Sequence, residues 1–125
     1  MTDNNASKPA ISIDYKQNRM RIYKRTLRLI GNPKHIILLI NPEEQVLIIL
    51  GSDKSDKKAF NVKYTQIKSN QSYEINCKHL LKQLLTVCNN WQDNCLYRIY
   101  GEVLQNQNAV QFQLVDAFIA CGTKG

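Results

Sequence analysis

The sequence lacks the short motifs by which many enzymes and metal proteins are recognised. It holds no glycine-rich phosphate loop, no nucleophile elbow and no paired-carboxylate arrangement. C-x-x-C spacing is also absent among its cysteines, and only two histidines could join them in a metal site: Cys77, Cys88, Cys95, Cys121, His35 and His79. Structural zinc sites usually pair their ligands at closer spacing. We therefore expect neither an enzyme nor a bound metal, and no cofactor.

Long apolar runs and a secretory signal are missing as well. The most apolar region is divided into two runs of five residues, 36–40 and 46–50, and neither is long enough to span a bilayer. Without a secretory signal, we expect reduced thiols, a cytoplasmic location and no membrane partner. At 125 residues the chain is expected to form one domain with a sizeable core.

Acidic residues are missing from one region, between Tyr15 and Pro42. Residues 1–35 hold eight bases and two acids, a net charge of +6, whereas the other ninety residues hold nine bases and eight acids, a net +1. The whole chain carries +7. A basic excess favours polyanionic partners such as nucleic acid, and a charge that served solubility alone would be spread more evenly. The charge distribution therefore indicates a local basic surface.

The first half of the chain predicts strands around one short helix. Alternation predicts strands at residues 11–14 and 19–22, the latter with its arginines facing outward. From Tyr23 the apolar spacing becomes helical, which places Tyr23, Leu27 and Ile30 inward, and Gly31 is expected to end the helix. Strands 36–40 and 46–50 form an apolar hairpin whose two faces should both be covered by a helix or a partner chain. A third strand is expected at 59–64.

The second half repeats this order. A strand at 72–75 leads through Asn76, a good N-cap, into an amphipathic helix at 77–87, and strands follow at 97–100 and 110–114. Tyr97 and Tyr100 are expected to share one face opposite Ile99 and to pack internally, although with Trp91 they could instead stack on bases. Aligning Ile22 with Ile75 also aligns Leu27 with Leu80, which suggests a weak repeat.

These patterns predict an α+β protein made of two tandem strand–helix–strand–strand(–strand) repeats, with a mostly antiparallel sheet and two helices. The repeats would cover residues 11–64 and 72–119 of a single domain, 11–120. A flexible N-terminal arm at 1–10 and a tail at 121–125 complete the expected organisation.

The central stretch LLINPEEQVLIILGSDKSDKKAFNVKY, which leads to SYEINCKHLLKQLL, resembles the centre of a DNA sliding-clamp domain. In such domains an apolar hairpin precedes a Ser-Asp loop, here Ser52-Asp53, a further strand, and a strand that enters an amphipathic helix. The resemblance covers roughly residues 11–119 and implies a clamp-like fold whose helices line a DNA-facing surface. Because clamps contain two or three such domains per chain, a ring would need more subunits here, so a homo-oligomer is expected.

A second, local resemblance concerns DYKQNRMRIYKRTLRLIG and the hairpin after it, which are similar to the swapped-hairpin DNA-binding regulators of the AbrB and MraZ type. Five residues fall in corresponding places: Asp14, Arg19, Ile22, Leu27 and Gly31. This resemblance implies a dimeric transcriptional regulator. We regard the clamp-like arrangement as the leading interpretation, because residues 77–87 predict a longer helix than the regulators use.

The candidate DNA-binding residues follow from charge and from the clamp resemblance. The basic run supplies five cations, and the clamp-like arrangement adds two lysines of the second helix: Arg19, Arg21, Lys24, Arg25, Arg28, Lys78 and Lys82. Such a surface would contact phosphates with low sequence specificity and strong salt dependence. The simpler alternative is a solvated polar face. A protein-interaction module that pairs through an exposed strand edge is the competing function.

Overall fold

The computed structural model describes residues 8–53, 58–64, 67 and 72–120, which form two antiparallel sheets and two α-helices. Each sheet has five strands, so the described part of the chain is mostly strand. This confirms the predicted α+β class with its antiparallel sheet and two helices. The expected tail, and residues 1–7 of the expected arm, lie outside the described residues.

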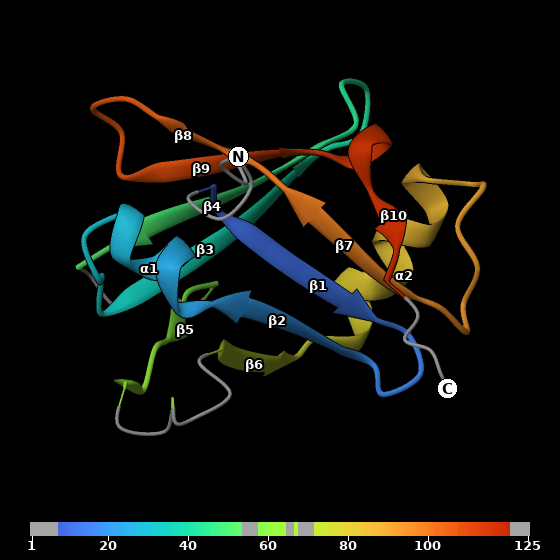
Figure 1. Cartoon of the computed structure of the whole chain (residues 1–125), viewed down its shortest axis with the longest axis horizontal. Helices are drawn as coiled ribbons and strands as arrows, with labels where there is room; N and C mark the ends of the chain where they lie inside the picture. Colours follow the sequence, from blue (N-terminus) through green and yellow to red (C-terminus); the bar gives the residue numbers. More distant parts are fainter. Residues whose placement is uncertain (1–7, 54–57, 65–66, 68–71, 121–125) are drawn as a thin grey trace, which may run out of the picture.

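The first sheet, sheet A, has its strands in the order β10 (Phe118–Ile119), β7 (Leu96–Tyr100), β1 (Ala10–Asp14), β2 (Arg19–Tyr23) and β6 (Ser72–Asn76). The second, sheet B, has the order β5 (Phe60–Asn61), β3 (His35–Asn41), β4 (Val46–Ser52), β9 (Ala109–Gln113) and β8 (Glu102–Leu104). In Figure 1, β1, β2 and β7 slope in the opposite direction to β3 and β4, so the strands of the two sheets run at an angle to each other.

The hydrophobic core lies between the inner faces of the two sheets. Sheet A contributes alternate residues such as Ile11 and Ile22, and sheet B contributes residues such as Ile49 and Phe112, all fully buried. In β2 the alternation predicted from the sequence is confirmed, because Met20 and Ile22 are buried while Arg19 and Arg21 lie on the outer face. Ala10 is also fully buried in β1, so β1 includes the last residue of the arm that we expected at residues 1–10.

Helix α1 (Lys24–Leu29) is short and ends as predicted at Gly31. Gly31 has a φ of +87°, and its N–H donates to the carbonyl of Arg28 while the N–H of Asn32 donates to that of Leu27. This pair of bonds is a Schellman motif, which satisfies carbonyls at the helix end and favours glycine at the left-handed position. The prediction that the helix ends at Gly31 is thus confirmed.

Helix α2 (Lys78–Val87) packs its leucines against the core, with Leu81 and Leu84 buried. It begins one residue later than predicted, because Cys77 rather than Asn76 is the N-cap, and no side chain caps it. The hydroxyl of Tyr15 donates to the carbonyl of Leu81 over 2.8 Å and ties the helix to the end of β1.

Three further expectations differ from the structure. Tyr23 faces outward, because it belongs to β2, where it follows Arg19 and Arg21 on the outer face. Tyr97 and Tyr100 lie on opposite faces of β7, since residues three apart in a strand alternate; Tyr97 is buried with Ile99. The third strand is shorter than expected, with only Phe60–Asn61 paired, and the sequence analysis did not predict the short strands β8 and β10.

The two halves of the chain connect the sheets differently. Helix α1 leads from β2 of sheet A to β3 of sheet B, whereas α2 leads from β6 to β7, both in sheet A. The strands before the helices, β2 and β6, pair antiparallel, with Arg19 opposite Asn76 and Tyr23 opposite Ser72. The helices therefore begin at opposite ends of this strand pair, as Figure 1 shows.

The apolar hairpin β3–β4 packs only one face against the core. On that face Ile36, Leu47 and Ile49 are fully buried, and Leu38 and Ile40 are partly buried. Two cross-strand pairs make up the other, outer face: Ile37 with Leu50, and Leu39 with Ile48. Leu39 is 45% exposed and the other three are partly exposed. The sequence predicted cover on both faces, but the described residues leave this face partly open.

Candidate nucleic-acid interface

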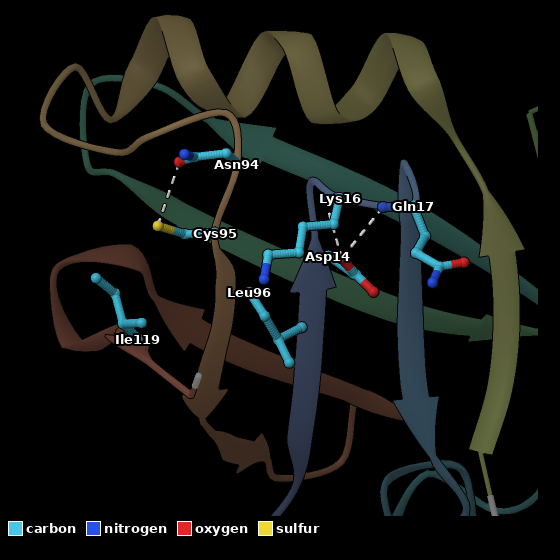
Figure 2. Close-up of a pocket in the computed structure, with 7 residues that line it drawn as sticks. All are labelled: Asp14, Lys16, Gln17, Asn94, Cys95, Leu96 and Ile119. Carbon is cyan, nitrogen blue, oxygen red and sulfur yellow. Dashed lines mark hydrogen bonds between the residues drawn. The ribbon is translucent and has the colours of Figure 1, made fainter. Parts of the chain in front are cut away.

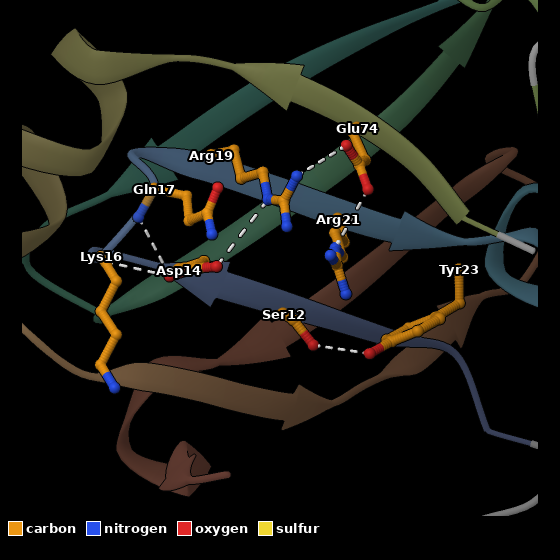
Figure 3. Close-up of polar contacts among 8 residues, drawn as sticks. All are labelled: Ser12, Asp14, Lys16, Gln17, Arg19, Arg21, Tyr23 and Glu74. Atoms are coloured by element: carbon orange, nitrogen blue, oxygen red, sulfur yellow. Dashed lines mark hydrogen bonds and ion pairs between the residues drawn. The ribbon is translucent and has the colours of Figure 1, made fainter. Parts of the chain in front are cut away.

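Arg19 and Arg21 project from the outer face of sheet A, as predicted, but both are paired with acids. Glu74 on β6 receives a hydrogen bond of 2.9 Å from Arg19, and its other carboxylate oxygen lies 3.2 Å from Nε of Arg21. Asp14 lies 3.8 Å from Nε of Arg19 and also accepts two backbone N–H bonds in the β1–β2 turn. Figure 3 shows these contacts on one face of the sheet.

The register of β2 with β6 creates this arrangement, because Arg21 is the direct partner of Glu74. Opposite charges directly across a strand pair attract one another, and partly exposed ion pairs of this kind contribute about 0.2–1 kcal/mol. The two arginines therefore carry less free positive charge than the local sequence suggests. Glu74 lies 55 positions from Arg19, so the local absence of acids gave no signal of it.

Helix α1 carries the remaining cations of the basic run. Lys24 and Arg28 are exposed, and among the described residues neither forms an ion pair. Arg25 is partly buried; its Nε donates to the carbonyl of Lys8 over 2.7 Å, and its guanidinium lies 5.9 Å from the ring centre of Tyr100. The helix has no acid in its first turn. We call Lys24, Arg25 and Arg28 the α1 cations.

Buried Thr26 fixes α1 against the end of β1. Its hydroxyl accepts the N–H of Ala10 and donates to the carbonyl of the same residue, both over 2.8 Å. Thr26 and Leu27 are fully buried, so this face of the helix points into the molecule. The opposite face of the helix carries Lys24 and Arg28, which are exposed to solvent. Because the Thr26 hydrogen bonds fix the helix, the positions of these two residues are also fixed.

Arg98 on β7 is a basic residue of this face that the sequence analysis did not single out. It shares the outer face of sheet A with Tyr23, whose hydroxyl accepts a 2.8 Å hydrogen bond from Arg98 and lies 2.7 Å from the Ser12 hydroxyl. The guanidinium lies 5.5 Å from the ring centre of Tyr23. In the sequence LYRIY, Arg98 lies between Tyr97 and Ile99, which face inward. This alternation could have indicated that Arg98 faces outward.

Lys78 and Lys82 are exposed on α2, at the other end of the β2–β6 pair from the start of α1. The two helices therefore do not bring all seven candidate residues into one cluster. The α1 cations and Arg98 lie around one end of sheet A, Arg19 and Arg21 lie beside Glu74, and the α2 lysines stand apart. Contact of any of these residues with DNA stays a prediction.

A small pocket beside the β1–β2 turn is lined by charged, amide and apolar side chains. Figure 2 shows Asp14 and Lys16 on one side, with Cys95, Leu96 and Ile119 on the other. The Asp14 carboxylate is occupied by the turn amides and Arg19. Among the residues that the structure describes, no group of three or more His, Cys, Asp or Glu could hold a metal ion.

The aromatic residues divide between the core and the surface. Trp91 stacks on Tyr97 with ring centres 4.5 Å apart, and Tyr15 packs edge-on against both. These three rings are used in internal packing. Tyr100 stacks instead on the partly exposed Phe118, with ring centres 6.0 Å apart. The Tyr100 ring is also contacted by the Arg25 guanidinium. Base stacking by Tyr97, Tyr100 or Trp91 therefore stays a prediction.

In the described ranges, no helix has the length and apolar character needed to cross a membrane. Comparison of the chain with family models, with curated proteins and with solved structures finds no match.

Proposed function

We propose that this chain is a non-enzymatic, cytoplasmic protein that associates with DNA through the phosphate backbone. The observation that carries the proposal is the exposed pair Lys24 and Arg28 on a helix without acids, for which the described residues supply no ion-pair partner. Arginine and lysine on a rigid element neutralise phosphates and release counterions, which gives binding with little sequence preference.

The proposed contact surface centres on α1 rather than on β2. Arg19 and Arg21 share the Glu74 carboxylate, so a phosphate would have to compete with that acid for them. Lys24 and Arg28 form no ion pair among the described residues. Arg19 and Arg21 therefore have a secondary role in the proposal, and the α1 cations with Arg98 have the main one.

A clamp-like arrangement forms part of the proposal. Two features support it: β2 and β6 are adjacent and antiparallel, and each strand leads directly into a helix. In that arrangement Lys78 and Lys82 of α2 would contact the same duplex as α1, and several copies of this single domain would assemble around DNA. Because α1 leads to sheet B and α2 stays within sheet A, the repeat that we propose comprises the strand–helix units alone.

Fluorescence anisotropy with a labelled duplex at two salt concentrations tests the proposal. The variant Lys24→Gln with Arg28→Gln removes two phosphate contacts, so the slope of log K against log salt should become shallower by about 1.8. The matched control, Lys16→Gln with Lys63→Gln, removes the same charge from two exposed residues elsewhere. Equal losses in the two variants would show that the net charge, and not α1, is responsible.

The competing function is a protein-interaction module, and one observation favours it. The outer face of β3–β4 presents Ile37, Leu39, Ile48 and Leu50 in two adjacent cross-strand pairs, and β8 forms an edge of the same sheet, since it pairs only with β9. A second copy that packed against this apolar face would cover it, and the β8 edge offers free backbone groups for pairing with a further strand. This interpretation makes the chain a homo-oligomer whose basic charge is incidental.

Sedimentation velocity over a range of concentrations tests this alternative. Leu39→Lys places a charge in the centre of the apolar face and should shift the chain toward monomer. Val115→Lys is the control, because Val115 is 72% exposed and lies outside that face. A wild-type chain that stays monomeric at the highest concentration would contradict both the dimer and the multi-subunit clamp.

A further inference from the structure

A cavity on the outer side of sheet A lies between two arginines. It has a volume of about 140 Å³ and is lined by Ala10, Tyr23, Arg25, Arg98 and Tyr100. The lining comes from β1, β2, α1 and β7, so four elements of the fold fix its shape. No carboxylate is among these lining residues. The space is large enough for several water-sized groups.

Arg98 forms one wall and is held in place without an acid. Its Nη2 donates to the hydroxyl of Tyr23, and that hydroxyl also contacts Ser12, a residue only 1% exposed (Figure 3 shows the tyrosine and the serine). Nε of Arg98 is sealed from solvent and, in the described part of the chain, has no hydrogen-bond partner. A sealed N–H donor without a hydrogen-bond partner is unfavourable unless a ligand supplies the acceptor.

Arg25 forms the facing wall and is fixed by different contacts. Its Nε is engaged by the carbonyl of Lys8, and its guanidinium lies beside the ring of Tyr100. Because Arg25 and Arg98 line the same small cavity, an anion there would lie near two positive charges. Guanidinium groups bind tetrahedral oxyanions through paired N–H donors, and prior positioning lowers the entropic cost of binding.

We propose that this cavity is a binding site for a phosphate group. The guanidinium of Arg98 is the principal donor, Arg25 supplies the second positive charge, and Tyr100 also lines the cavity. The inference goes beyond general contact with a DNA backbone, because it assigns one discrete site to one chemical group. The phosphate could belong to a DNA strand or to a small phosphorylated molecule, and the chemistry of recognition is the same.

Titration with inorganic phosphate at constant low ionic strength tests the site, with sodium chloride as the reference salt. In NMR spectra of the wild-type chain, the Arg98 Nε–H signal should shift and saturate with phosphate but not with chloride. Arg98→Gln should weaken binding about tenfold or more, because it removes a charge-assisted contact. The control Lys16→Gln removes an equal charge at the other end of β1 and should leave the affinity within about twofold.

A linear response without saturation, or equal weakening by Arg98→Gln and Lys16→Gln, would overturn the proposal and indicate diffuse attraction only. If Arg98→Gln does not fold, Arg25→Gln at the opposite wall tests the same site and should also weaken binding about tenfold or more.

A second titration assigns the source of the phosphate. At constant ionic strength, a duplex that displaces phosphate from the cavity identifies the DNA backbone as the source, whereas undisturbed phosphate identifies a small molecule. Lys24 and Arg28 lie outside the lining. Loss of duplex binding in the Lys24→Gln, Arg28→Gln variant therefore tests the proposed function, while phosphate saturation tests the cavity, so either proposal can fail without the other.

Discussion

Glu74 should act as an internal competitor of DNA, so replacing it with glutamine should strengthen binding. In the wild-type chain one carboxylate holds Arg19 at 2.9 Å and Arg21 at 3.2 Å. Glu74→Gln keeps the size and polarity of the side chain but removes its charge. Arg21 then has no acid within ion-pair distance among the described residues, and Arg19 keeps only Asp14 at 3.8 Å.

The expected magnitude follows from the number of arginines that are released. Each additional phosphate contact steepens the slope of log K against log salt by about 0.9, so one or two contacts steepen it by about 0.9–1.8. Between 50 and 200 mM salt, each contact makes the affinity fall by about a further 3.5-fold. The stability cost should be about 1 kcal/mol or less, since the ion pairs are partly exposed.

Anisotropy titrations of a labelled duplex at several salt concentrations measure this slope. Glu43→Gln is the matched control, because Glu43 is exposed in the β3–β4 turn and its loss changes the net charge equally. A steeper slope in Glu74→Gln than in Glu43→Gln is the predicted result. If the two variants bind DNA with the same affinity and slope, Arg19 and Arg21 do not reach the phosphates even when unpaired, and the reasoning about this face is refuted.

Three other predictions concern packing, titration and the second helix. Gly101→Ala should destabilise the fold by about 1–3 kcal/mol or more in urea denaturation, because a Cβ there would lie 2.6 and 2.8 Å from ring atoms of Phe112; an unchanged midpoint would contradict this close packing. Burial raises the pKa of the Cys77 and Cys88 thiols to about 11, above the usual value of 9.0. The unfolded chain therefore releases these protons first. Stability should be constant below about pH 8 and should fall by about 1 kcal/mol per thiol between pH 8 and pH 10 in the wild type but not in the double alanine variant. Lys78→Gln with Lys82→Gln should make the salt dependence of DNA binding shallower by about 1.8 if α2 shares the duplex with α1, and an unchanged slope would remove α2 from the proposed surface.

Local sequence signals predicted the elements whose structure depends on near neighbours. Gly31 ends α1 because a left-handed residue is needed one position beyond the helix, and glycine adopts it without strain. Alternation in β2 predicted that Met20 and Ile22 would be buried. The start of α2 was displaced by one residue because Asn76 remains paired in β6, opposite Arg19.

The features that the sequence did not indicate are products of strand pairing between distant segments. Glu74 neutralises Arg19 and Arg21 only because β6 pairs with β2, and no local pattern encodes that register. Arg98 approaches Tyr23 because β1 lies between β7 and β2 in sheet A. Charge counted along the chain therefore indicated a basic region correctly, but it could not distinguish the paired arginines of β2 from the exposed cations of α1.

The most direct test of DNA association is the binding of the wild-type chain to two duplexes of equal length and unrelated sequence, measured across a range of salt concentrations. The account predicts binding at low salt with nearly equal affinity for both duplexes and a linear fall of log K with log salt, with a slope of about −2 or steeper from Lys24 and Arg28. Absence of binding at low salt, or an affinity that does not change with salt, would contradict it.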